Sequence, residues 1–145
     1  MMLRKEFQEH ALKGVLFPAV SEWIASYGTA VINTPHKGSF VLSMKIHESL
    51  KENRPCAMII NVQDKEQAAD YARELLIMEM TTMSGEELDR LLTIVVRMRN
   101  VLESEEGTEF IEGVITHGAY ETENLKGRIE VVSDDSKIID LLLSS

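Results

Sequence analysis

Six side chains in this sequence have the chemistry needed to hold a small anionic ligand. Cationic side chains bind phosphate or carboxylate oxygens, and an aromatic ring can stack on a base. If the loops that carry these residues meet at one end of a sheet, they predict a site that binds or sequesters a nucleotide-like anion. The basic residues are His36, Lys37, Arg54, Lys126 and Arg128, and the aromatic residue is Tyr120.

The run TPHKGS, which contains two of these residues, also has a simpler explanation as a turn. Pro35 suits the second position of a type I turn, and Gly38 suits the left-handed residue that completes a bulged hairpin. A phosphate-binding loop would instead lead into a helix, whereas a strand-like alternation follows here. We therefore predict a hairpin whose tip can still present His36 and Lys37 to a ligand.

No motif in the sequence indicates catalysis, a cofactor or a bound metal. The single cysteine, Cys56, follows Pro55 at the start of an apolar segment, where a buried side chain is expected rather than a reactive thiolate. His117 lies near Glu121 and Glu123, but a polar loop explains that grouping equally well. We therefore assign no catalytic, cofactor-binding or metal-ligating residue and expect a protein that is not an enzyme, with a small hydrolase as a third alternative.

The hydrophobic periodicity predicts the elements that must position these residues. It indicates one α+β domain over residues 1–145, with a mostly antiparallel sheet of about five strands. Residues 1–28 form an N-terminal helical arm that consists of a helix at 2–15 and a second helix that ends at Gly28. Residues 29–62 supply three strands, and the polar run at 47–55 is expected to be a surface loop.

The second half is predicted to begin with a helical hairpin at 64–103. Asp64 with Gln67 and Ser84 with Glu87 form the capping patterns that start its two helices. Residues 108–145 are expected to form two strands and a C-terminal helix. The first of these strands is TEFIEGVIT at 108–116, a polar loop separates it from the second, and Ser133 or Asp134 caps the final helix.

The helix after Ser84 is apolar around most of its circumference, which indicates burial and suggests a contact between subunits. Leu92 and Val96 on this helix, with Trp23 of the N-terminal arm, are the predicted interface residues. We therefore expect a small interaction protein, such as a regulator, inhibitor or assembly factor, that acts as a homo-oligomer or binds a protein partner. A binder of a small anionic ligand is the alternative.

The composition narrows the range of partners. A formal charge of −9 argues against direct binding to double-stranded DNA, although the acids concentrated after residue 62 can form either a docking face or a solvated surface. No stretch approaches the roughly 20 apolar residues of a membrane span. The lone cysteine and the absence of a signal-peptide pattern favour a cytoplasmic location.

Overall fold

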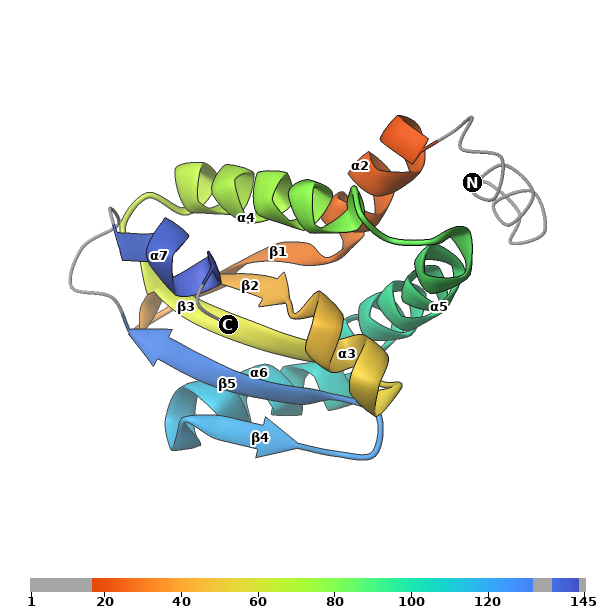
Figure 1. The fold of residues 1–145 in the computed structure, drawn as a ribbon. Coiled ribbons are helices and arrows are strands. Elements are labelled where there is room, and N and C mark those ends of the chain that lie inside the picture. The colour runs from red at the N-terminus through yellow and green to blue at the C-terminus, as the bar shows by residue number, and fades with distance from the viewer. Residues whose placement is uncertain (1–16, 132–136, 144–145) are drawn as a thin grey trace.

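The structure is a computed structural model that describes residues 17–131 and 137–143. Its centre is a five-stranded sheet in the order β1-β2-β3-β5-β4, with helices on both faces (Figure 1). Neighbouring strands are antiparallel except β3 and β5, which run parallel. The predicted α+β class and mostly antiparallel sheet are therefore confirmed. The strands are β1 (Thr29–Thr34), β2 (Gly38–Met44), β3 (Cys56–Val62), β4 (Ala119–Glu121) and β5 (Lys126–Val131).

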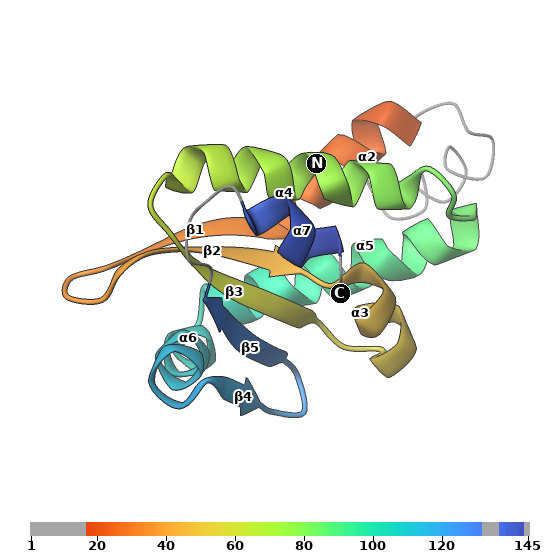
Figure 2. The same ribbon diagram turned by 60° about the vertical axis from the view of Figure 1, so that its left-hand side comes forward.

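Strands β1 and β2 form the hairpin that the run TPHKGS predicted. Thr34 is paired with Gly38, which has a φ of 95°, a left-handed conformation that glycine adopts without strain. The Thr34 hydroxyl accepts a hydrogen bond from the Lys37 amide and donates one to the Gly38 carbonyl, each at 2.9 Å. These bonds fix a tight turn at the end of a hairpin that projects beyond the other strands (Figure 2).

Two layers of helices bury the two faces of the sheet. Helices α4 (Lys65–Met80) and α7 (Ile138–Leu143) cover one face, where Met58 and Ile60 point. Helices α5 (Gly85–Leu102) and α6 (Glu105–His117) cover the other face, where Ile59 points. The central strand β3 is thus buried on both sides, which accounts for its continuously apolar sequence.

The helix α2 (Phe17–Tyr27) packs against α4 and α5 and leads through Gly28 into β1. The helix predicted at 2–15 lies outside the described residues. The same is true of Ser133 and Asp134, the predicted caps of the C-terminal helix, although α7 forms within the expected range. None of the helices in the described ranges has the length and apolar character needed to cross a membrane.

The helical hairpin forms as its capping patterns predict. The Asp64 side chain accepts a hydrogen bond from the Gln67 amide, and Ser84 with Glu87 makes a complete capping box. Helix α5 contacts α2, α6 and the short helix α3 (Ile46–Glu52) of the same chain. These contacts explain why so much of the circumference of α5 is apolar, since they bury several of its sides within one chain.

The prediction of a surface loop at 47–55 is wrong, because most of this segment is helix α3 (Ile46–Glu52). The helix is polar because it buries only Ile46 and Ser49. The Ser49 hydroxyl accepts a hydrogen bond from the Cys56 amide at 2.9 Å and donates one to the Cys56 carbonyl at 3.2 Å. Asn53, with a φ of 56°, ends the helix in the left-handed conformation.

The strand predicted at 108–116 is also wrong, because these residues belong to α6. Its β-branched residues favour a strand, but Phe110 and Val114 are four residues apart and lie on one buried helical face. The partner of β5 is instead β4, a strand of three residues inside the predicted loop.

Candidate functional site

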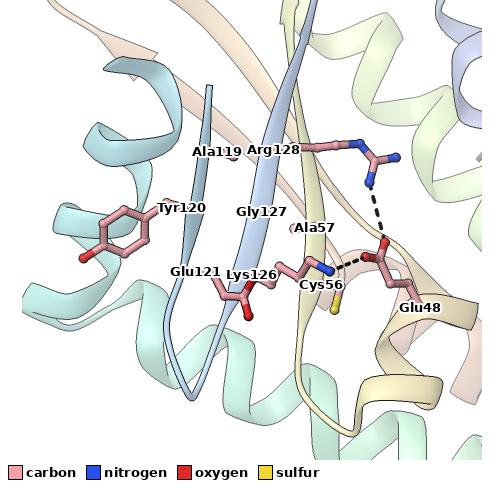
Figure 3. Close-up of a pocket in the computed structure, with 9 residues that line it drawn as sticks. All are labelled: Glu48, Cys56, Ala57, Ala119, Tyr120, Glu121, Lys126, Gly127 and Arg128. Carbon is pink, nitrogen blue, oxygen red and sulfur yellow. Dashed lines mark ion pairs between the residues drawn. The ribbon is translucent and has the colours of Figure 1, made fainter. Parts of the chain in front are cut away.

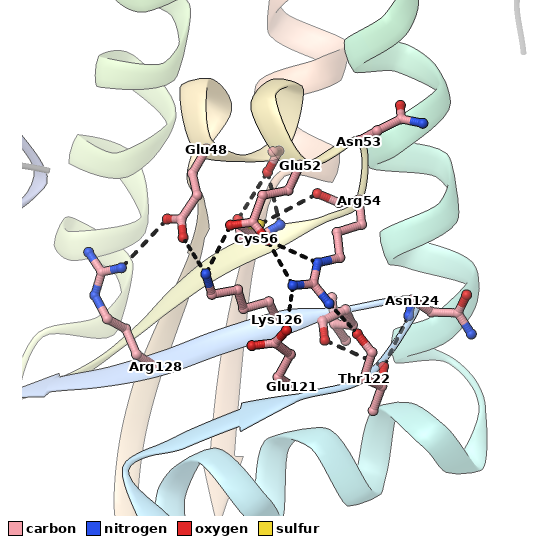
Figure 4. A network of polar contacts seen from close by, with 12 residues as sticks. Glu48, Glu52, Asn53, Arg54, Cys56, Glu121, Thr122, Asn124, Lys126 and Arg128 are labelled. Atoms are coloured by element: carbon pink, nitrogen blue, oxygen red, sulfur yellow. Dashed lines mark hydrogen bonds and ion pairs between the residues drawn. The ribbon is translucent and has the colours of Figure 1, made fainter.

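A cluster of charged side chains joins α3 to β5 and β4 (Figure 4). Glu48 and Glu52 are four residues apart in α3, which places both carboxylates on one face of the helix. The Lys126 ammonium of β5 lies between them, at 2.9 Å from Glu52 Oε2 and 3.2 Å from Glu48 Oε1. Lys126 therefore holds the short helix against the sheet.

Arg54, between α3 and β3, connects Glu52 to β4. Its guanidinium donates hydrogen bonds to Glu52 Oε1 at 2.7 Å and to Glu121 Oε2 at 2.5 Å. A third bond, of 2.5 Å, reaches the Thr122 carbonyl. The hydrogen bonds that Arg54 donates to Glu121 and Glu52 raise the pKa of Arg54 above its ordinary value.

Arg128 completes the cluster and sets its charge balance. Its guanidinium lies 3.6 Å from Glu48 Oε2 and donates a bond of 3.0 Å to Glu130 Oε1. Three cations thus face four carboxylates, so the cluster has no excess positive charge. An anionic ligand would have to displace a carboxylate from its partner, which disfavours anion binding here.

A cavity of about 410 Å³ lies beside this cluster, and Figure 3 shows Glu48, Cys56 and Lys126 at its edge. Burial raises the pKa of the Cys56 thiol to about 11, so the thiol stays protonated at neutral pH and is a poor nucleophile. Ligand atoms of Glu48, Glu52 and Cys56 lie within 4.8 Å of one another. Both carboxylates already pair with cations, Glu48 with Lys126 and Arg128 and Glu52 with Lys126 and Arg54, which disfavours a metal ion at this position.

Lys45 and Glu79 form a second group of perturbed residues, next to the charged cluster. Burial and the charge of Arg128 lower the pKa of Lys45, and burial raises the pKa of Glu79. Such shifts in a cleft are a feature of active sites. The cavity between them has a volume of only about 30 Å³, the scale of one water molecule, so a substrate has no room to bind.

The charged cluster makes stability depend on pH through Glu52. Hydrogen bonds, first from Lys126 and then from Arg54, lower the pKa of Glu52 from 4.5 to about 2. Because the folded-state pKa is depressed, this carboxylate stabilises the fold above about pH 4.5, and the contribution is lost as pH falls towards 2. We expect Glu52→Gln to lower the urea midpoint at pH 7 and to change it little near pH 2.

Urea titrations of both proteins at several pH values between 7 and 2 measure this difference. The matched control is Glu74→Gln, which changes an exposed glutamate of α4. A gap between wild type and Glu52→Gln that stays constant over the whole pH range would contradict the assignment.

The structure brings together three of the six residues predicted to bind an anion. Arg54, Lys126 and Arg128 share the charged cluster. Tyr120 points away from them towards α6, where its ring makes an edge-to-face contact with Phe110 at 6.1 Å (Figure 3). The turn that carries His36 and Lys37 lies at the opposite end of the sheet, because Ser39 pairs with Val62 whereas Lys126 pairs with Cys56.

His36 and Lys37 instead border a third cavity, of about 420 Å³, which we call the hairpin–α6 groove. Its apolar floor comes from Ile32 of β1 and from Ile111 and Ile115 of α6. The Lys37 ammonium donates a hydrogen bond of 3.3 Å to the Thr116 hydroxyl, which ties the tip of the hairpin to the helix. The groove therefore combines an apolar floor with a polar rim.

The three residues predicted at an oligomer interface pack within their own chain. Trp23 is half-buried and stacks on Tyr27 with ring centroids 4.3 Å apart. Leu92 is only 7% exposed, and Val96 is half-buried against the same core. Large exposed apolar side chains lie elsewhere in the described residues, at Val31, Met78, Val131, Ile139 and Leu143.

Sequence reasoning missed the acidic partners and the groove for related reasons. Glu48 and Glu52 lie in a segment predicted as a loop, so their four-residue spacing did not indicate that they share one face of a helix. Ile111 and Ile115, also four residues apart, fell in the segment predicted as a strand. In both segments the four-residue spacing was the available signal.

No family model matches the chain, and comparisons with curated proteins and with solved structures find no similar protein.

Proposed function

We propose that the protein is a non-enzymatic interaction protein that works as a homo-oligomer. One observation carries this proposal: strand β1 forms an edge of the sheet, contains no charged residue, and borders the hairpin–α6 groove with its apolar floor. Edge strands and exposed apolar grooves are surfaces on which other polypeptide chains bind. The roles that fit such a surface are those of a regulator, an inhibitor or an assembly factor.

The charged cluster supports this proposal because its chemistry suits neither anion binding nor catalysis. Its cations already have carboxylate partners, and the Cys56 thiol beside them stays protonated. Lys45 and Glu79, next to the cluster, border a cavity that is too small for a substrate. These features are those of a structural clamp that holds α3 on the sheet. The nucleotide-binding alternative therefore has less support than the interaction role, since half of its residues lie apart from the other half.

Native mass spectrometry of the full chain as purified tests the proposal. We expect a discrete multiple of the 16.4 kDa chain with no additional bound mass, and we expect the multiple to persist on dilution to low micromolar concentration. Sedimentation velocity on the same samples provides an independent measure of the assembly in solution.

Two outcomes would overturn the proposal. A protein that is monomeric at every accessible concentration would contradict the homo-oligomer. An extra mass of a few hundred daltons per protomer, lost on unfolding, would favour the anionic-ligand alternative instead.

A further inference from the structure

Helix α6 presents two neighbouring rows of side chains to the hairpin–α6 groove. Residues four apart lie above one another on a helix, so Ile111 and Ile115 form one row, and Thr108 and Glu112 form part of the next. The two isoleucines are half-buried and form the floor with Ile32, whereas Thr108 and Glu112 are exposed at the rim. A ligand can therefore place an apolar body on one row and a polar head on the other.

The rim of the groove carries one cation and one anion that the fold leaves unpaired. The Lys37 ammonium donates its hydrogen bond to the neutral Thr116 hydroxyl, one helical turn from Glu112. Within residues 17–131 and 137–143, neither Lys37 nor Glu112 forms an ion pair. Every cation of the charged cluster, by contrast, has a carboxylate partner. The two groove charges are therefore available to a ligand.

We propose that the hairpin–α6 groove binds a free α-amino acid with an apolar side chain. The ligand's carboxylate binds the Lys37 ammonium, its ammonium binds the Glu112 carboxylate, and its side chain covers the isoleucine floor. This inference goes beyond the proposed function, since contacts between protein chains do not require a small ligand.

The two rim charges select a zwitterion over a simple anion or a simple cation. An anion that reaches Lys37 is repelled by Glu112, and a cation that reaches Glu112 is repelled by Lys37. Thr116, which Lys37 contacts, lies about 6 Å from Glu112 along the helix axis, at 1.5 Å per residue. An α-amino acid carries both of its charges on one carbon atom. A single ligand can therefore neutralise both side chains without displacing an existing ion pair.

The size of the groove favours a ligand as small as an amino acid. Its volume of about 420 Å³ lies near the lower end of the range of roughly 300 to 1,000 Å³ for small-molecule sites, which combine an apolar lining with a few polar groups. His36, Lys37 and Glu112 at the rim are exposed, so a ligand exchanges readily with solvent. We therefore expect the ligand to be lost during purification, and it has to be added to measure binding.

Heteronuclear NMR of the isotope-labelled full chain, titrated with L-leucine and separately with L-phenylalanine, tests the site. We expect saturable shifts that centre on residues 32–37 and 108–116. Three analogues each lack one feature of L-leucine: N-acetyl-L-leucine lacks the ammonium, L-leucinamide lacks the carboxylate, and free glycine lacks the apolar side chain. Each analogue should bind about 10-fold more weakly than L-leucine, because one partner in the groove is then left without its contact.

Two variants remove the rim charges one at a time. Glu112→Gln and Lys37→Gln each replace a charged group with a neutral amide, and each should raise the dissociation constant for L-leucine by about 10-fold. The matched controls are Glu109→Gln and Lys51→Gln, which change exposed residues outside the groove and should leave the dissociation constant unchanged. The same NMR spectra show whether each variant is folded.

The possible outcomes separate this inference from the proposed function. Saturable binding of L-leucine that both groove variants and all three analogues weaken would support the site. N-acetyl-L-leucine that binds as tightly as L-leucine would overturn the assignment of a zwitterion, and a lack of saturable binding by both amino acids would overturn the site. A strictly monomeric protein that binds L-leucine in the groove would overturn the proposed function and leave this inference standing.

Discussion

Replacing Phe110 with alanine is expected to lower the free energy of unfolding by about 3 to 5 kcal/mol. Phe110 is fully buried between α6 and β5, and its ring makes an edge-to-face contact with the Tyr120 ring. Alanine removes the ring and leaves a cavity that the surrounding elements fill only in part. Because a domain of this size is stable by roughly 5 to 15 kcal/mol, the loss is a large share of the total.

Gly127 provides a more specific test of this packing. A Cβ added at Gly127 would lie 2.4 Å from Cζ of Phe110, which is closer than two carbon atoms can approach. Gly127→Ala alone should therefore be destabilising, and it should cost less in a chain that already carries Phe110→Ala. Urea unfolding of the two single variants and the double variant measures the coupling, expected at about 1 to 3 kcal/mol. Strictly additive losses would contradict the contact.

The sequence predicts the elements whose local signals agree with their burial. The turn at residues 34–38 combines Pro35 and Gly38 at the positions that a bulged hairpin requires. The alternation in β2, the continuous apolar run in β3 and the capping box at Ser84 likewise match the sheet and α5. At these positions local preference and tertiary packing favour the same structure.

The sequence fails to predict elements where tertiary packing opposes local preference. Helix α6 contains several β-branched residues and two glycines, yet it is helical because Phe110 and Val114 bury one face against the sheet. Helix α3 is short and polar, and it is held by the Ser49 hydroxyl and by ion pairs to Lys126, a residue 74 positions away from Glu52. No local window of the sequence contains the ion pairs to Lys126.

The same limit applies to the candidate site. The sequence identifies Arg54, Lys126 and Arg128 as basic residues, and the prediction that they lie close together is consistent with the structure. Their neutralisation by Glu48, Glu52 and Glu121 depends on the parallel pairing of β3 with β5, which sets Lys126 beside Cys56. The whole helical hairpin lies between β3 and β5 in the sequence. The sequence therefore reveals the cations but not the carboxylates that partner them.

Gly107→Ala is expected to disrupt the corner between α5 and α6 and to lower the free energy of unfolding by about 3 kcal/mol, at the upper end of the cost of overpacking. A Cβ at this position would lie 2.4 Å from the Val101 carbonyl oxygen and 2.5 Å from Cα of Leu102. These are backbone atoms of the last turn of α5, so no side-chain rotation relieves the clash. The better helix propensity of alanine, worth up to about 1 kcal/mol, offsets only part of the cost.

Urea unfolding of Gly107→Ala beside Glu109→Ala measures this cost, since Glu109 is an exposed residue of the same helix. Glu109→Ala should stay within about 0.5 kcal/mol of wild type, as expected for a surface substitution. Because the corner sets the position of α6, Gly107→Ala should also displace Ile111 and Ile115 from the hairpin–α6 groove. Faster hydrogen exchange across α6 in Gly107→Ala would report that displacement. Equal stability of the two variants would show that α5 and α6 approach each other less closely than the structure indicates.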